Sequence, residues 1–353
     1  MLKSPQMETI TYQYRIKDNS LKKTLIKMSS EVNFVWNFAN NIIQKRWKES
    51  RQYTDEKLLS GLTKGASKEL EINSQTIQAV YEELLKRVKR HKKQIRFRSR
   101  KRKLGWIPFK GQTFKFCGNY STYNGYKIRY WYHRPLPEGA VVKTGSFSED
   151  ALGRWYLNLV VTFPEYLEPA LNESVGIDLG IKTTLTCSDG VKFERPSFTT
   201  NNSEALAKAQ KYRKKRQTKK IHAKIKNQRK DWNHKTTFSL AKKFKNIFVG
   251  DTSSQDILTE INNINKAIYD ASWFELKTLL SYKVLRRQGV FQEVSELYST
   301  ETCSVCLVKS GPSGVKSLKI REWTCSVCKT LHDRDINAAR NHLRLGHESL
   351  RAA

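Results

Sequence analysis

Long apolar runs are missing from this sequence of 353 residues, and none approaches the length of a membrane span. The first twenty residues, MLKSPQMETITYQYRIKDNS, also lack the apolar core of a secretory signal peptide. We therefore expect a cytoplasmic protein that does not enter a membrane. The sequence has no internal repeat and no long low-complexity tail. Because 38% of its residues are hydrophobic and recur periodically, a packed fold of about two or three domains is feasible.

Acidic residues are scarce: 33 Asp and Glu stand against 65 Lys and Arg, which gives a formal net charge of +32. Self-repulsion at this charge is unfavourable unless a polyanion relieves it. Nucleic acid is the natural partner, because each neutralised phosphate releases counterions. A basic ribosomal protein or a membrane-surface protein is the alternative that composition leaves open.

The N-terminal half combines strands with amphipathic helices. Residues 8–17 alternate in polarity, which predicts a strand, and helical spacing of apolar residues predicts helices over 20–49 and 74–92. Residues 113–162 are rich in Tyr, Phe, Trp and Val and contain turn signals such as Asn-Gly, which predicts antiparallel strands. We expect these strands to form a small barrel with the first strand, and the helices to be an insertion.

The C-terminal half follows another order. We predict a strand over 174–180, a hairpin of two strands over 184–194, and helices over 204–230 and 233–244. A fourth strand over 246–251, a helix over 269–288, a fifth strand over 290–296 and a final helix over 333–345 follow. This is the order of an RNase H-like fold. In such a sheet the fourth strand lies between the first and the fifth.

Two basic stretches are candidates for nucleic-acid contact. Residues 96–103 contain six basic residues in eight, and the neighbouring Phe97, Trp106 and Phe109 could stack on bases. The helix predicted over 204–230 carries twelve basic residues from position 208 on. A solvated surface is the simpler alternative for either stretch. The candidate nucleic-acid-binding residues are Arg96, Arg98, Arg100, Lys101, Arg102, Lys214, Lys215 and Arg216.

Four of the six cysteines form two Cys-x-x-Cys pairs that are separated by 18 residues: Cys303, Cys306, Cys325 and Cys328. Each pair can place two thiolates on one side of a tetrahedral ion, so the spacing predicts a zinc site. Disulfides are the alternative, and a reducing cytoplasm disfavours them. With four protein ligands the zinc would be structural, and its binding would supply folding free energy to a segment too small to build a core.

Three aspartates suggest a second metal site. Asp178 stands in an apolar strand, where a carboxylate is costly unless it is paired or metal-bound. Asp333 and Asp335 precede a helix, and capping that helix is the simplest role for one of them. Together the acids suggest a carboxylate cluster for Mg²⁺. Two such ions would activate a water and stabilise a leaving oxygen, so the reaction would be phosphodiester hydrolysis.

Several motifs resemble those of the TnpB family, the transposon-encoded RNA-guided nucleases related to type V CRISPR effectors. They are GIDLGIK (176–182), CSVC (303–306), REWTCSVC (321–328) and HDRDINAARN (332–341). The resemblance is specific from about residue 174 to residue 343. In the N-terminal half it is weaker, but the order of the predicted strands and helices is consistent with the family. It implies an α+β multidomain fold. The N-terminal part would be a small wedge-type β-barrel at 1–18 and 93–168, with an inserted helical recognition domain at 19–92. The C-terminal part would be an RNase H-like RuvC nuclease at 169–298 and 331–353, with an inserted zinc ribbon at 299–330.

The resemblance also implies a function. The family binds a transposon-end guide RNA, recognises a short adjacent motif on double-stranded DNA and cleaves that DNA with Mg²⁺, for which Mn²⁺ can substitute. We therefore expect an RNA-guided, divalent-metal-dependent DNA endonuclease that acts as a monomeric ribonucleoprotein at the bacterial nucleoid. The match assigns Asp178 as the first RuvC acid and Asp335 as the last.

The middle acid departs from the family pattern, which has Glu then Asp after the fourth strand. This sequence has Gly250 and Asp251 there. Glu296, at the end of the fifth strand, is the favoured replacement, as in similar branches of the family. Alternation places it on the face opposite Glu293. We interpret Asp251 as a cap for the segment that follows it. The alternatives are that Asp251 is the ligand or that the protein is catalytically inactive.

Two competing functions follow from these alternatives. The first is a nuclease-inactive, RNA-guided DNA-binding repressor, against which the retained Asp178 and Asp335 argue. The second is a recombinase of RNase H-like fold that acts without RNA. The basic residues are spread over more of the chain than a DNA duplex alone would need, which argues against the recombinase.

Overall fold

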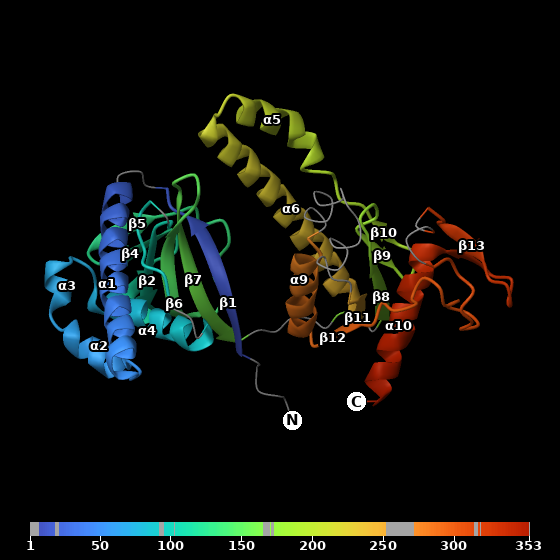
Figure 1. Ribbon diagram of the computed structural model, residues 1–353, viewed down its shortest axis with the longest axis horizontal. Helices are drawn as coiled ribbons and strands as arrows, with labels where there is room; N and C mark the ends of the chain where they lie inside the picture. The colour runs from blue at the N-terminus through green and yellow to red at the C-terminus, as the bar shows by residue number, and fades with distance from the viewer. Residues whose placement is uncertain are drawn as a thin grey trace. The chain divides into compact units, whose positions relative to one another are not determined.

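The computed structural model describes residues 7–17, 21–91, 95–101, 103–164, 170, 173–251, 272–313, 317 and 319–352. The chain divides into two units, Met1–Tyr166 and Leu167–Ala353, and each is described by itself (Figure 1). Within the described ranges no helix is both long and apolar enough to cross a bilayer.

The first unit contains two antiparallel sheets. One has the order β1 (Met7–Arg15), β7 (Trp155–Pro164), β6 (Val141–Glu149), β2 (Trp106–Lys110). The other has the order β3 (Phe114–Phe116), β4 (Tyr120–Tyr123), β5 (Tyr126–Arg129), and a short 3₁₀ turn η1 (Gly111–Thr113) precedes it. An isolated bridge between Ile16 and Tyr130 connects the two sheets. The antiparallel strands are as predicted, whereas closure into a barrel stays a prediction.

The helices of the first unit share the core of its strands. They are α1 (Leu21–Ser50), α2 (Glu56–Leu62), α3 (Ala66–Glu69) and α4 (Ser74–His91). Trp36 of α1 and Leu84 of α4 belong to the same buried cluster as Phe109 of β2 and Phe147 of β6. The helical segment is therefore packed on the sheets rather than around a core of its own. Phe109 is 1% exposed, so the expectation that it stacks on bases is wrong.

The second unit is built on one five-stranded sheet, in the order β10 (Lys192–Phe193), β9 (Leu185–Cys187), β8 (Glu173–Leu179), β11 (Phe244–Gly250), β12 (Val290–Val294). The first three of these are antiparallel, and β11 runs parallel to both β8 and β12. The fourth strand in sequence thus lies between the first and the fifth, as predicted. The fifth strand ends at Val294 rather than at the predicted residue 296.

Helices cover the two faces of this sheet. On one face, Ile177 and Val249 pack in a cluster with residues of α6 (Lys215–Lys243) and α9 (Trp273–Arg286). On the other face lies α10 (Arg334–Ala352). This helix touches β8 at Gly176, where an added Cβ would lie 2.0 Å from the carbonyl oxygen of Ala339. The α10 face of the sheet is therefore fixed by backbone contact.

The basic helix differs from its prediction. It is not continuous over 204–230: after η2 (Thr200–Asn202), α5 (Ser203–Lys211) ends at a turn in which Arg213 has a φ of 50°. Figure 1 shows α5 folded back along α6, and Ala209, Ile221 and Ile225 form the cluster between them. The predicted break before residue 233 is absent, because α6 runs through it. Burial of these three side chains offsets the strained turn.

Two short strands, β13 (Glu322–Thr324) and β14 (Leu331–Asp333), form an antiparallel pair directly before α10. They flank the second cysteine pair. The remaining domain boundaries inferred above stay predictions.

Replacing Gly176 with Ala tests the contact between β8 and α10. The methyl group would meet backbone atoms, so we expect the free energy of unfolding to fall by about 3 kcal/mol or more. Gly61→Ala in α2 is the control, because nothing lies within 4 Å of its Cβ position. Ala favours helix, so this change should be neutral or slightly stabilising. Equal urea midpoints for the two variants would show that α10 does not depend on Gly176.

Candidate functional site

Asp178 lies on the α10 face of β8 and is buried. Burial raises its pKa well above the ordinary value, and the negative charges of Glu296 and Asp335 raise it further, against the opposite effect of Arg334 and Arg321. The three acids, which are far apart in sequence, are therefore close enough to interact. Carboxylate oxygens are the ligands that hard cations such as Mg²⁺ take, and a divalent cation near these acids would stabilise the ionised form of Asp178, so the chemistry of the three side chains is compatible with a hard metal ion.

Asp333 and Asp335 have different surroundings. Asp333 Oδ1 accepts hydrogen bonds from the backbone N–H groups of Asp335 and Ile336, both at 3.0 Å, and its Oδ2 pairs with Lys192 Nζ at 2.7 Å. Burial raises the pKa of Asp333, but the Lys192 ammonium and the two N–H donors bring it below its ordinary value. Asp333 is thus the cap of α10. Asp335 carries the carboxylate that acts on Asp178, with Arg321 at 3.4 Å.

Glu296 lies two residues beyond the end of β12. Within that strand, Gln292 Nε2 donates to Ser349 of α10 at 2.7 Å, whereas Glu293 pairs with Lys277 of α9 at 2.5 Å. Even-numbered residues therefore face α10, as the alternation predicted. The effect of Glu296 on the pKa of Asp178 agrees with that placement.

Asp251 is exposed at the end of β11. Its backbone N–H donates to Val294 O at 2.9 Å, and its Oδ1 accepts from the backbone N–H of Glu296 at 3.0 Å. The carboxylate therefore caps the chain beyond β12. The predicted cap of the segment that follows Asp251 stays a prediction, because that segment, residues 252–255, falls outside the described residues.

Gly250 has no room for a side chain. A Cβ there would lie 2.8 Å from Cε1 of His342, a fully buried residue of α10. The Nδ1–H of His342 donates to Ile177 O at 3.0 Å, and burial lowers the pKa of this imidazole to about 4, so it is neutral at neutral pH. His342 therefore fills the space that an acid at position 250 would need. Sequence reasoning missed this residue, because its position on α10 gives no sign of the contact.

The four predicted cysteines come together. Their sulfur atoms lie within 4.8 Å of one another, with Cys303 and Cys328 at 3.6 Å and Cys306 and Cys325 at 3.5 Å. Within the part of the chain that the structure describes, this is the only set of three or more such ligands so close together. Ser310 Oγ lies 3.2 Å from Cys325 Sγ, and this hydrogen bond, together with those from the backbone N–H groups of Cys328 and Val327, lowers the pKa of that thiol to about 5. The set fits a tetrahedral zinc ion.

Helix α10 also holds the first cysteine pair. The side-chain amides of Asn337 and Asn341 both donate to the carbonyl oxygens of Ser299 and Thr302, at 2.7 to 3.2 Å. Asn337 Oδ1 in turn accepts from the backbone N–H of Ser304 at 2.8 Å. The cysteine cluster and Asp335 are thus fixed to the same helix.

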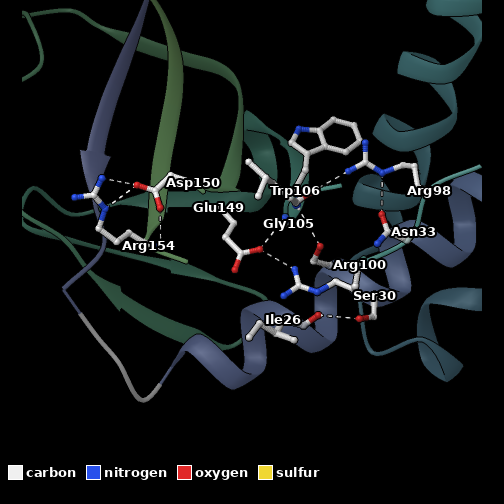
Figure 2. A network of polar contacts seen from close by, with 12 residues as sticks. Ile26, Ser30, Asn33, Arg98, Arg100, Gly105, Trp106, Glu149, Asp150 and Arg154 are labelled. Carbon is white, nitrogen blue, oxygen red and sulfur yellow. Dashed lines mark hydrogen bonds and ion pairs between the residues drawn. The ribbon is translucent and has the colours of Figure 1, made fainter. Parts of the chain in front are cut away.

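Within the basic stretch 96–103, some side chains contact other residues of the first unit, as Figure 2 shows, and others face solvent. Arg98 donates from Nε to Asn33 Oδ1 at 2.8 Å, and its guanidinium lies 5.5 and 5.3 Å from the ring centroids of Trp36 and Trp106. Arg100 pairs with Glu149 at 2.8 Å. Both side chains therefore support the fold.

The other basic candidates face solvent where they are described. Arg96 and Lys101 are exposed, as are Lys214, Lys215 and Arg216 at the α5–α6 turn. Lys214 Nζ lies 5.7 Å from the centroid of the Tyr212 ring. Arg102 lies outside the described residues.

Two protein-family models match the chain. The first, described as "Probable transposase", covers residues 161–257, and the second, "Cas12f1-like, TNB domain", covers residues 273–342. Together they span the sheet, the helices beside it and the cysteine cluster.

Named relatives share part of the chain. A Streptomyces pristinaespiralis protein provisionally named an RNA-guided DNA endonuclease is 34% identical over 60% of this chain and 55% of its own length. The Escherichia coli (strain K12) protein InsQ, named in the same way, is 28% identical over 60% of this chain and 58% of its own. The mimivirus TnpB-like protein L79 is 24% identical over 60% and 44%. The chain thus spans about half the length of the relatives it matches.

A solved structure shares the fold. It is the cryo-EM structure of a Cas12f1–sgRNA–target DNA complex, which aligns with a TM-score of 0.64 and 11% identity over 95% of this chain and 98% of that one. The likeness extends over both units.

Zinc content tests the cysteine cluster. We expect purified protein to carry one zinc ion per chain and the Cys303→Ser variant to lose it, because a tetrahedral site with three protein ligands is no longer closed. Ser310→Ala is the control, since it removes a neighbour of Cys325 but no ligand. Elemental analysis of the folded proteins measures the outcome, and wild-type protein without zinc would contradict the assignment.

A double-mutant cycle tests the contact between Gly250 and His342. Gly250→Ala should lower the free energy of unfolding by about 1–3 kcal/mol, because the methyl group meets a buried ring. In a His342→Ala background the same change should cost little, since the ring is gone. Urea unfolding of the four proteins gives the coupling free energy. Strictly additive effects would show that the two residues do not compete for space.

Proposed function

Because the chain belongs to the TnpB family, we propose that it is an RNA-guided, divalent-metal-dependent DNA endonuclease of a transposon. In this proposal it binds a transposon-end guide RNA, works as a monomeric ribonucleoprotein and cleaves double-stranded DNA beside a short adjacent motif. The names of two relatives, which describe RNA-guided DNA endonucleases, support the reaction class.

The observation that carries the proposal is the electrostatic interaction of three carboxylates from separate parts of the chain. Asp178 comes from β8, Glu296 from the chain beyond β12, and Asp335 from the first turn of α10. Both other acids raise the pKa of Asp178, so negative charge is concentrated at one edge of the sheet. Such a concentration is costly in the folded protein, and cation binding is the direct physical reason to maintain it.

The proposed mechanism assigns the three acids as Mg²⁺ ligands. Bound divalent ions would supply an activated water and a stabilised leaving oxygen for phosphodiester hydrolysis. Asp178 provides a ligand on a strand that its neighbours hold on both sides. Asp333 fixes the first turn of α10, and thereby the backbone of Asp335.

Exposed cations are the proposed contacts for nucleic acid. Arg96 and Lys101 in the first unit and Lys214, Lys215 and Arg216 in the second can neutralise phosphates, because they face solvent. In the Cas12f1 complex the solved chain is bound to sgRNA and target DNA, and its shared fold supports both partners for this chain. The cysteine cluster, with zinc, would hold its segment folded and take no part in the chemistry.

Substitution of the acids tests cleavage. Asp178→Ala, Asp335→Ala and Glu296→Gln should each reduce Mg²⁺-dependent cleavage of target DNA to background and leave guide RNA binding nearly unchanged, because these acids hold metal and not the duplex. Glu293→Gln is the matched control on the opposite face of β12, and it should cut normally. Cleavage gels and filter binding on the purified ribonucleoprotein measure both properties.

The alternatives predict other results in the same experiment. Normal cutting by Glu296→Gln would remove that residue from the site. A wild-type protein that binds its target and never cuts would be the nuclease-inactive repressor. Cutting by wild-type protein freed of RNA would instead favour the recombinase.

Salt dependence tests the basic run. Arg96→Ala combined with Lys101→Ala should weaken RNA binding and flatten the dependence of log K on log[salt], by about 0.7 to 0.9 for each lost phosphate contact. Arg98→Ala is the contrasting variant: it should lower thermal stability, because it removes a side chain packed on two tryptophans. An unchanged salt slope in the double variant would mean that Arg96 and Lys101 are only solvated.

A further inference from the structure

Glu296 stands on a piece of chain that the sheet does not hold. The ladder between β11 and β12 ends at the pair Gly250 and Val294. Two hydrogen bonds then fix the peptide groups of Glu296: its N–H donates to Asp251 Oδ1 at 3.0 Å, and its carbonyl oxygen accepts from the N–H of Ser299 at 3.0 Å. The position of this acid therefore depends on two residues outside the three carboxylates.

Both supports are themselves anchored. Asp251 follows the last ladder position of β11, and its own N–H donates to Val294 O at 2.9 Å. Together its two hydrogen bonds close a small ring with residues 294–296. Ser299 is held by α10, because its carbonyl oxygen accepts from the side-chain amides of Asn337 and Asn341 at 3.2 and 2.9 Å. The backbone of Glu296 is thus tied to β11 on one side and, through Ser299, to α10 on the other.

We propose that Asp251 is a positioning residue for the metal site: its carboxylate oxygen holds the backbone of Glu296 so that the Glu296 side chain is directed towards Asp178 and Asp335. The inference rests on the proposed function and adds a residue to it. A catalytic group must be held to within about 0.5 Å of its working position. A segment beyond the end of a strand, without the hydrogen bonds of the sheet, does not provide that precision. The Asp251 carboxylate supplies the missing constraint from the neighbouring strand.

The chemistry of the contact separates this role from that of a metal ligand. An N–H donor needs an oxygen acceptor, which an asparagine side chain also offers at the same distance from the backbone. A Mg²⁺ ligand of this kind depends on the negative charge, which asparagine lacks. Alanine removes both the acceptor and the charge. Asp251→Asn and Asp251→Ala therefore behave alike for a ligand and differently for a positioning residue.

The experiment compares these two variants with wild type as purified ribonucleoproteins. We expect Asp251→Asn to cleave target DNA at close to the wild-type rate. Asp251→Ala should lose about 10- to 100-fold in rate and need a higher Mg²⁺ concentration for half-maximal cleavage, as is typical when a group that orients a metal ligand is removed. Asp150→Ala is the matched control: it removes a carboxylate that accepts from the backbone N–H groups of Leu152 and Arg154 in the first unit, and it should not change the Mg²⁺ requirement.

Mn²⁺ binding, followed by electron paramagnetic resonance on the same samples, keeps the inference testable if wild type binds DNA and never cuts. In that case the proposed function fails, but the positioning role still predicts weaker Mn²⁺ binding by Asp251→Ala than by wild type or Asp251→Asn. Loss of cleavage and Mn²⁺ affinity by both variants would make Asp251 a ligand and overturn the inference. An Asp251→Ala variant with wild-type rate and affinity, or a wild type that binds no Mn²⁺, would also overturn it.

Discussion

Helix α10 can lie on strand β8 only because Gly176 has no side chain, and most of the candidate chemistry depends on that contact. The carbonyl oxygen of Ala339 occupies the place where a Cβ would be. From this position α10 presents Asp335 to Asp178 at one end, holds the first cysteine pair through Asn337 and Asn341, and fills the space beside β11 with His342. One backbone approach between a strand and a helix thus sets the geometry of both candidate metal sites.

The chemistry at the end of β11 is divided between two neighbouring residues. On the α10 face, the ring of His342 occupies the space beside Gly250, so an acid at position 250 would have to displace a buried ring. Asp251 lies beyond the ladder and is exposed, and its carboxylate reaches the backbone of Glu296 on the next strand. Adjacent strands are about 4.8 Å apart, so an acid moved from β11 to the end of β12 must recover that distance. In the proposed site, the longer side chain of Glu and the backbone of residue 296, fixed by Asp251, would together recover that distance.

Local patterns predicted what depends on local spacing. The even-numbered face of β12, the meeting of the four cysteines and the capping role of one of the two aspartates before α10 follow from periodicity or short motifs. The strand order of the second unit was predicted from the RNase H-like fold that the order of its elements indicates. The misses depend on distant contacts. No Gly or Pro marks the turn at Arg213, which forms because Ala209 meets Ile221 and Ile225. Likewise the charge run around Arg98 gave no sign that two tryptophans and an asparagine take up that side chain.

Asp178 shows how the second unit sustains a site that burial alone would oppose. Desolvation and two neighbouring acids raise its pKa, and Arg334 and Arg321 offset only part of that effect. The first turn of α10 adds a further compensation, because the partial positive charge of a helix N-terminus favours the nearby carboxylates of Asp333 and Asp335. Asp333 is saturated by Lys192 and two backbone N–H groups, whereas the charges around Asp178 remain unbalanced. The two aspartates of one unit thus differ in charge balance: the protein itself lowers the pKa of Asp333 and raises that of Asp178, and in the proposed function a ligand of positive charge would stabilise the ionised form of Asp178.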